Sequence, residues 1–137
     1  GVDRISFINC RQSERSRLKY DRLHRKAISA MKQSLKFYYP EIIEIVNFED
    51  FLLANEVAES LSLIAHLNED SVSIKEIIEH KDNSDIQILI GPEGDFHPEE
   101  VKQAKEKGWK SVHLGPSRLR TETAAITSVG FCYYNGL

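Results

Sequence analysis

Short apolar runs alternate with longer stretches of helical periodicity along this 137-residue chain. At the start, Ile5 and Phe7 alternate with polar neighbours, which predicts a strand within residues 2–10. Further apolar runs of strand length predict strands at residues 42–46, 61–67, 86–90 and 111–114.

The stretches between these runs predict helices. The longest has apolar residues at helical spacing from residue 20 to 36, with most of its arginines and lysines on the other side and Pro40 beyond it. Shorter helices are predicted at 48–54, 74–80 and from Pro98 onward, where His97 or Asp95 can cap the helix and Gly108 follows it. This alternation predicts a single α/β domain spanning 1–137, with a mostly parallel sheet and helices on both faces.

The final helical segment is unusual, because residues 123–137 include no charged side chain. Thr121 or Thr123 can cap this helix. A helix that is apolar nearly all round must be covered on most sides. Periodicity does not decide what buries this helix: it could pack in the core of a monomer or against a second subunit.

Charge is unevenly distributed in the chain. Residues 1–40 carry ten Lys/Arg against three acids, a local charge of +7 that leaves −10 for the remainder of a chain with net charge −3. Such a basic block is a candidate footprint for a nucleic-acid backbone, and a solvated helix face is the alternative. No apolar stretch is long enough to span a membrane and no signal peptide is recognisable, so we expect a cytoplasmic protein.

Cysteine and histidine spacing gives no sign of a disulfide framework or a metal centre. Cys10 and Cys132 stand at opposite ends of the chain, which favours two reduced thiols over a disulfide. The five histidines are widely separated and none pairs with a cysteine at ligand spacing, so we expect no bound metal.

Residues suited to ligand binding come directly after three of the predicted strands. Open parallel sheets bind ligands beyond the carboxyl ends of their strands, and here these ends carry His66-Leu67, the loop GPEGDF at 91–96 and the loop GPSRLRTETA at 115–124. Glycines let backbone groups approach a ligand closely, which suits a flat heterocycle. The chain has neither GxxxxGK[ST] nor a GxGxxG after its first strand, which excludes P-loop and ordinary dinucleotide-binding sites.

These loops resemble the C-terminal signature of a known family. The resemblance rests on the segments 90–94 (IGPEG), 98–100 (PEE), 114–115 (LG) and 119–124 (LRTETA), and on Ala30, Gln33-Ser34 and Pro40-Glu41 in the first half. The chain is thereby identified as similar, over nearly its whole length, to the ribosomal RNA small subunit methyltransferase E family. Members of this SPOUT class methylate N3 of a uridine in 16S ribosomal RNA. Asp95 stands where the family usually has a second glycine, and Lys36 where it usually has an arginine.

The resemblance implies a fold, a cofactor and partners. It implies a SPOUT-type trefoil knot in the C-terminal third, S-adenosyl-L-methionine bound within that knot, and a homodimer formed through the last helix. It implies the small ribosomal subunit, through its 16S rRNA, as the substrate. The family also has an N-terminal PUA-like β-barrel domain, which is expected to be absent from these 137 residues.

The same resemblance, with the strand-end argument, gives candidate site residues. Arg120 is the candidate catalytic cation near the uracil carbonyls, and Glu122 would orient it or relay the proton; a structural salt bridge is the alternative role for both. The candidate RNA contacts are Arg11, Arg15, Arg17 and Lys36. The candidate cofactor-binding residues are His66, Leu67, Ile90, Gly91, Pro92, Glu93, Gly94, Leu114, Gly115, Leu119, Arg120, Thr121, Thr123 and Ala124.

Other functions remain open on the sequence. A SPOUT methyltransferase acting on a ribose 2′-hydroxyl would share the knot and the cofactor. A non-catalytic RNA-binding or dimerisation module would share only the basic block or the apolar helix.

Overall fold

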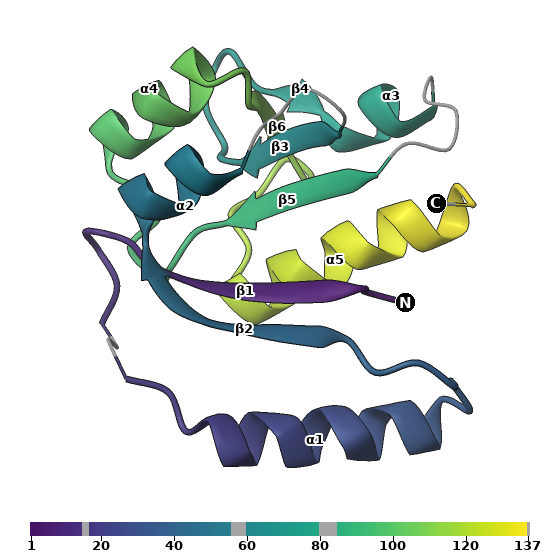
Figure 1. Cartoon of the computed structure of the whole chain (residues 1–137). Coiled ribbons are helices and arrows are strands. Elements are labelled where there is room, and N and C mark those ends of the chain that lie inside the picture. Colours follow the sequence, from purple (N-terminus) through teal and green to yellow (C-terminus); the bar gives the residue numbers. More distant parts are fainter. Residues whose placement is uncertain (15–16, 56–59, 80–84, 137) are drawn as a thin grey trace.

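The computed structural model describes residues 1–14, 17–55, 60–79 and 85–136 (Figure 1). Among the described residues the elements follow one another as β1 (Arg4–Asn9), α1 (Tyr20–Gln33), β2 (Glu41–Asn47), α2 (Phe48–Ala54), β3 (Leu61–Ala65), β4 (Val72–Ser73), α3 (Ile74–Glu79), β5 (Ile86–Ile90), α4 (Pro98–Glu106), β6 (Lys110–His113) and α5 (Thr121–Tyr134). His80, placed by the sequence at the end of the α3 helix, lies outside the described residues.

Every strand pair seen in the described part of the chain is parallel, which confirms the predicted fold class. The strands form two sheets rather than one: β1 pairs with β2, and a four-stranded sheet has the order β4-β6-β3-β5. β4 was not predicted, because two residues are too few to show a period. Since β3 lies between β5 and β6 and parallel to both, the carboxyl ends of these three strands meet at one edge.

Helices cover both faces of the four-stranded sheet, as predicted. Successive residues of a strand point to opposite faces, and in β3 the neighbours Leu63 and Ile64, both fully buried, belong to different cores. Ile64 packs with residues of α2 and α4 such as Phe48 and Ala104. Leu63 packs with Ile74 of α3 on the other face, where side chains of α5 complete the second core.

Local signals set both ends of α4. His97 is the N-cap and its side chain accepts a hydrogen bond from the backbone N–H of Glu99, while the Glu100 carboxylate accepts one from His97 N–H at 2.8 Å. This is a capping box, and it selects His97 over Asp95 among the two predicted caps. Gly108 follows the helix with φ of +91°, a conformation that glycine adopts without strain.

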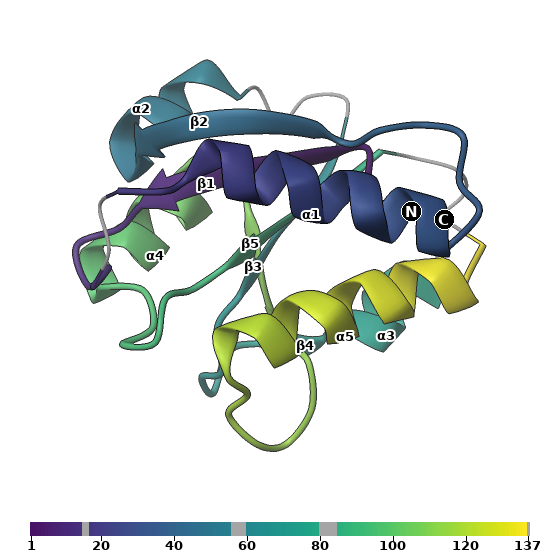
Figure 2. The same ribbon diagram turned by 90° about the horizontal axis from the view of Figure 1, so that it is seen from below.

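Helix α1 is shorter than predicted and is the least packed element. It ends at Gln33, because Leu35 takes a left-handed φ of 54° and Lys36 N–H donates back to Met31 O at 3.0 Å. None of its residues is buried. It lies on the outer side of the β1–β2 pair, and both views place the N- and C-termini at the same end of the molecule (Figures 1 and 2).

Helix α5 begins at Thr121, with Arg120 as its N-cap and no side-chain cap. The prediction that Thr121 or Thr123 caps it is therefore wrong, since the Thr121 hydroxyl donates to Gly91 O instead. Only Ala124 and Ser128 of this helix are buried. Its apolar side chains Ile126 and Tyr133 are 74% and 65% exposed, so this chain alone leaves much of the helix uncovered.

Three further observations bear on the sequence expectations. Cys10 and Cys132 are both free thiols. No helix in the described ranges combines the length and apolar character needed to cross a bilayer. Likewise, no group of three or more His, Cys, Asp or Glu side chains among the described residues could hold a metal ion.

Candidate functional site

A pocket lies where the carboxyl ends of β3, β5 and β6 meet. Three chain segments that are distant in the sequence form its wall, one after each strand, and the first turn of α5 closes it. Its lining residues are Ala65, His66, Leu67, Ile90, Gly91, Pro92, Glu93, Asp95, Val112, His113, Leu114, Gly115, Ser117, Arg118, Leu119, Thr121 and Ala124.

The structure brings most of the candidate cofactor residues together on this lining. Those that line the pocket are His66, Leu67, Ile90, Gly91, Pro92, Glu93, Leu114, Gly115, Leu119, Thr121 and Ala124. Gly94, Arg120 and Thr123 are not on the lining. Gly94 instead lies against the Gln12 side chain, where a Cβ atom would be 2.7 Å from Gln12 Oε1.

A hydrogen bond joins the two glycine-containing loops at the pocket. The Thr121 hydroxyl, in the first turn of α5, donates to the Gly91 carbonyl oxygen at 2.9 Å. Gly115, in the second loop, has φ of +150°, which glycine adopts far more readily than other residues. The start of α5 is thus fixed against the loop after β5, and Thr121 and Ala124 of its first turn line the pocket.

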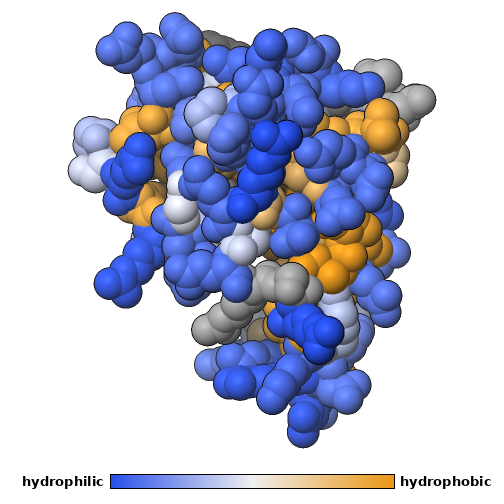
Figure 3. All heavy atoms as spheres, turned by 90° about the vertical axis from the view of Figure 1, so that its left-hand side faces the viewer, coloured by the Kyte–Doolittle hydropathy of each residue, from blue (hydrophilic) through white to orange (hydrophobic). Residues whose placement is uncertain are grey.

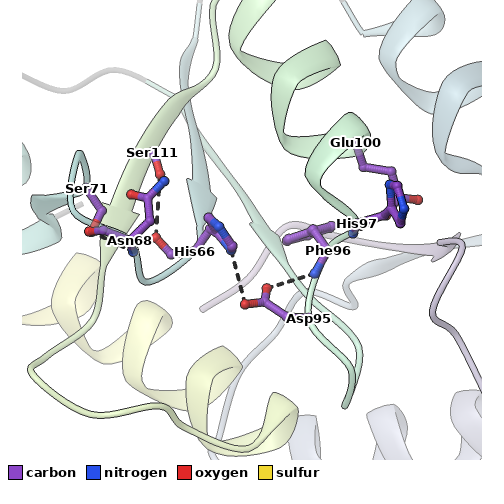
Figure 4. Close-up of polar contacts among 8 residues, drawn as sticks. All are labelled: His66, Asn68, Ser71, Asp95, Phe96, His97, Glu100 and Ser111. Carbon is purple, nitrogen blue, oxygen red and sulfur yellow. Dashed lines mark hydrogen bonds and ion pairs between the residues drawn. The ribbon is translucent and has the colours of Figure 1, made fainter.

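His66 and Asp95 form a polar pair across the pocket lining (Figure 4). Nδ1 of His66 lies 3.1 Å from Oδ2 of Asp95, and the side chains are 19% and 24% exposed. The other carboxylate oxygen of Asp95 accepts the backbone N–H of Phe96 at 2.8 Å.

Sequence reasoning missed several lining residues. Asp95, Ser117 and Arg118 lie within loops that were singled out, but only their neighbours were assigned. His113 and Val112 lie at the end of β6, and the strand-end rule that selected His66 could have found His113. Its Nδ1 atom is buried and has no hydrogen-bond partner among the described residues.

The candidate catalytic residues lie at the edge of the pocket. Arg120 and Glu122 are exposed and alternate along the chain with Leu119 and Thr121, which line it. Within the part of the chain that the structure describes, neither Arg120 nor Glu122 forms an ion pair. The structural salt bridge weighed as the alternative role is therefore not seen there.

The candidate RNA contacts do not form one cluster. Arg17 and Lys36 are exposed just before and just after α1. Arg11 makes a 3.7 Å ion pair with Glu49, and its backbone N–H donates to the buried Glu100 carboxylate at 2.9 Å. Arg15 lies outside the described residues.

Comparison with known proteins gives a consistent result. A family model described as "RNA methyltransferase domain" matches residues 1–132. The chain is 35% identical over 131 residues to "Ribosomal RNA small subunit methyltransferase E" of Rickettsia conorii, and the match covers 94% of this chain and 52% of that protein. The chain spans about half the length of the curated relatives it matches.

Solved structures share the fold. A probable rRNA-methyltransferase from Porphyromonas gingivalis is similar with a TM-score of 0.90 and 40% identity, over 98% of this chain and 57% of that one. A ribosomal RNA small subunit methyltransferase E from Neisseria gonorrhoeae, solved bound to S-adenosyl methionine, is similar with a TM-score of 0.75 and 28% identity, over 89% and 52% of the two chains.

Proposed function

The chain belongs to the RNA methyltransferase family, and on that premise we propose that it transfers a methyl group from S-adenosyl-L-methionine to N3 of a uridine in 16S ribosomal RNA. One observation carries the proposal: the loops after β5 and β6, far apart in the sequence, form one pocket with the end of β3. The substrate follows from the relatives named for rRNA methylation. The proposed substrate places the activity in the cytoplasm.

The pocket residues fit the adenosyl cofactor. Backbone groups beside Gly91 and Gly115 can reach the edge of a flat base without obstruction by a Cβ atom. The unpartnered Nδ1 of His113 adds a polar group, and the N–H groups that begin α5 suit a carboxylate. The cofactor supplies an electrophilic methyl group on a sulfonium centre, and the protein has to orient it toward the nucleophile.

Arg120 and Glu122 are proposed to act on the uracil ring. N3 of uridine carries a proton in neutral solution, so the ring must lose it or be stabilised as an anion. The Arg120 guanidinium near the uracil carbonyls favours the deprotonated ring. Glu122 either orients Arg120 or relays the proton. Their exposure beside the pocket lining supports a role toward RNA rather than toward the cofactor.

The RNA surface is proposed to include the loop before α1 and α1 itself. Arg11, Arg17 and Lys36 are the candidate contacts in this region. A shallow hollow along α1 is lined by residues of that helix alone, including Arg22, Arg25 and Lys26, and none of these three cations forms an ion pair with another described residue. Figure 3 shows hydrophilic side chains over α1, at the bottom of that view. Such a surface attracts phosphate groups.

A homodimer through α5 is proposed from the exposure of this helix. Ile126, Val129, Tyr133 and Tyr134 are exposed on a helix without a charged residue after Glu122. Apolar surface of this kind is typical of subunit interfaces. Of the two possibilities that the sequence left open, we therefore favour burial of α5 against a second subunit.

Calorimetric titration of the purified protein with S-adenosylhomocysteine tests the cofactor site. We expect saturable one-to-one binding per chain that is lost when bulk is introduced into the pocket by Gly91→Trp. A Leu53→Trp variant on α2, where the original side chain is 70% exposed and lies outside the pocket lining, is the matched control for binding. Absence of binding by the unaltered protein would refute the proposal.

Nucleoside analysis then identifies the product. Mass spectrometry of 16S rRNA from a strain lacking the protein should show loss of one 3-methyluridine. Loss of a 2′-O-methylated nucleoside instead would identify a ribose methyltransferase of the same class. Unaltered rRNA with intact RNA binding would identify a non-catalytic module.

A further inference from the structure

The His66–Asp95 pair has a defined proton arrangement. A carboxylate offers only acceptor sites, so the 3.1 Å contact requires Nδ1 of His66 to donate a proton to Oδ2 of Asp95. In the neutral imidazole, the lone pair then belongs to Nε2. Among the residues that the structure describes, Nε2 has no hydrogen-bond partner. In this neutral form, His66 presents an acceptor nitrogen on a ring that lines the pocket.

Further hydrogen bonds restrain both members of the pair, and Figure 4 shows the one between the Asp95 carboxylate and Phe96 N–H. The backbone N–H of His66 donates to Val112 O at 3.0 Å, which extends the pairing of β3 with β6 by one residue. The backbone N–H of Asp95 donates to Pro92 O at 2.9 Å, and its carboxylate also accepts Phe96 N–H. The ring is thus fixed through its backbone and through Nδ1, and its remaining nitrogen is the one without a protein partner.

The backbone of Asp95 gives an independent reason to look for a role of its side chain. Its φ of +67° lies in the left-handed region, where residues other than glycine are strained by about 1 kcal/mol or more and where Asp is among the better tolerated. Glycine would occupy this position without strain. At this position the carboxylate makes two contacts that a glycine could not, with His66 Nδ1 and with Phe96 N–H.

We propose that Asp95 is a positioning residue, which holds His66 so that Nε2 accepts a hydrogen bond from a donor group of the bound adenosyl cofactor. The donor is a ribose hydroxyl or the α-ammonium group, since both chemistries fit an imidazole lone pair. The inference rests on the proposed function, because it takes the pocket as the cofactor site. Without the carboxylate, the ring can turn or take the other tautomer, and the acceptor is lost for part of the time.

Titration of Asp95 variants with S-adenosylhomocysteine tests this role. Asp95→Gly should weaken binding about five- to tenfold, the scale of one hydrogen bond; relief of the backbone strain and loss of the acceptor for Phe96 N–H act on the melting temperature in opposite directions. Asp95→Asn keeps an acceptor oxygen and tolerates the same φ, so it should bind within about twofold of the unaltered protein. A merely structural role would weaken binding in Asp95→Gly independently of His66.

If Asp95 acts by positioning His66, its effect on cofactor affinity should depend on the His66 side chain. His66→Ala should weaken binding as much as Asp95→Gly, and adding Asp95→Gly to His66→Ala should cause no further loss. Glu106→Gln, which removes an exposed acid near the end of α4, controls for the change in net charge. Additive losses in the double variant would overturn the inference.

A second ligand separates the two possible donors. 5′-Methylthioadenosine has the ribose hydroxyls but lacks the amino acid. If Asp95→Gly weakens binding of both ligands, the donor is a ribose hydroxyl; if it weakens only S-adenosylhomocysteine, the donor is the ammonium group. Unchanged affinities for both ligands in Asp95→Gly and His66→Ala overturn the inference and leave the proposed function intact. Failure of the unaltered protein to bind either ligand overturns both.

Discussion

Neighbouring residues at the start of α5 have different surroundings. Thr121 is fixed to Gly91 O by its hydroxyl, while Arg120, one residue earlier, is exposed and off the pocket lining. A side chain fixed to the opposite loop shapes the pocket. A free cation beside the pocket is instead available to a second ligand. The two residues should therefore differ in which step they affect.

Arg120→Ala is expected to separate chemistry from cofactor binding. Because Arg120 does not line the pocket, affinity for S-adenosylhomocysteine should stay within a few-fold. Methyl transfer to rRNA should fall by about 10²-fold or more, the scale of removing one electrostatic catalyst. Lys105→Ala, an exposed cation on α4, is the control and should leave both unchanged. Unchanged turnover in Arg120→Ala would refute the catalytic role.

Cys10 is expected to make stability fall at alkaline pH. Burial, and secondarily the nearby Glu100 charge, raises the pKa of the Cys10 thiol from its ordinary value of 9.0 to about 12. Between these values the unfolded chain loses the thiol proton while the folded protein keeps it, so the contribution of Cys10 is complete below about pH 9 and decreases above it. Urea unfolding measures this contribution. The free energy of unfolding of the unaltered protein, relative to that of Cys10→Ala, should be lower at pH 10 than at pH 8. A constant difference would contradict this.

At the scale of elements, Glu100 connects the start of α4 to the N-terminal loop. One carboxylate oxygen accepts His97 N–H and the other accepts Arg11 N–H, and the side chain is fully buried. The capping box could be expected from a cap followed by Glu three residues later. The contact with Arg11 could not, because it joins residues 89 positions apart.

Glu100→Ala should destabilise the fold strongly. It leaves two backbone N–H groups without their acceptor, and each such loss costs about 1 to 3 kcal/mol, so a decrease of about 2 to 6 kcal/mol in the free energy of unfolding is expected. Glu99→Ala, one residue earlier on the exposed side of α4, is the control, with a change within about 0.5 kcal/mol. Chemical denaturation monitored by circular dichroism measures both. Equal losses of stability in the two variants would show that the hydrogen bonds accepted by the Glu100 carboxylate do not stabilise the fold.

Elements with strong local signals were predicted well. α2 and β5 have the predicted bounds, and α4 starts at Pro98 as expected, since caps, prolines and glycines act within a few residues. The end of α1 was placed too late because a left-handed residue at Leu35 is not visible in apolar spacing. β4 was missed because its pairing with β6 defines it, rather than its own two residues.

At the scale of the whole molecule, the exposed apolar face of α5 should control association. We expect the unaltered protein to sediment as a dimer and Ile126→Asp to sediment as a monomer, because a charge would be buried in the interface. Leu53→Asp on α2, where the original side chain is 70% exposed, is the matched control and should remain dimeric. An unaltered protein that is monomeric at micromolar concentration would exclude the proposed dimer.

RNA affinity should depend steeply on salt. The ten basic residues among positions 1–40 stand on a chain with net charge −3, so attraction to phosphate has to come from this local block. Neutralised phosphates release counterions, and the logarithm of the association constant should fall linearly with the logarithm of salt concentration. Replacing both Arg17 and Lys36 by Ala should make that slope shallower. A salt-independent affinity would point to a different RNA surface.

The trefoil knot that the family resemblance implies stays a prediction. The amino-acid sequence by itself determined the alternation of strands and helices, the start of α4 and the two glycine-containing loops, because each depends on residues within one or two turns of chain. Tertiary structure decided the pairing of His66 with Asp95, 29 residues apart, and the exclusion of Arg120 from the pocket lining. The physical reason is that strand order and the direction of each side chain at a strand end follow from packing of the whole domain, which no local period encodes.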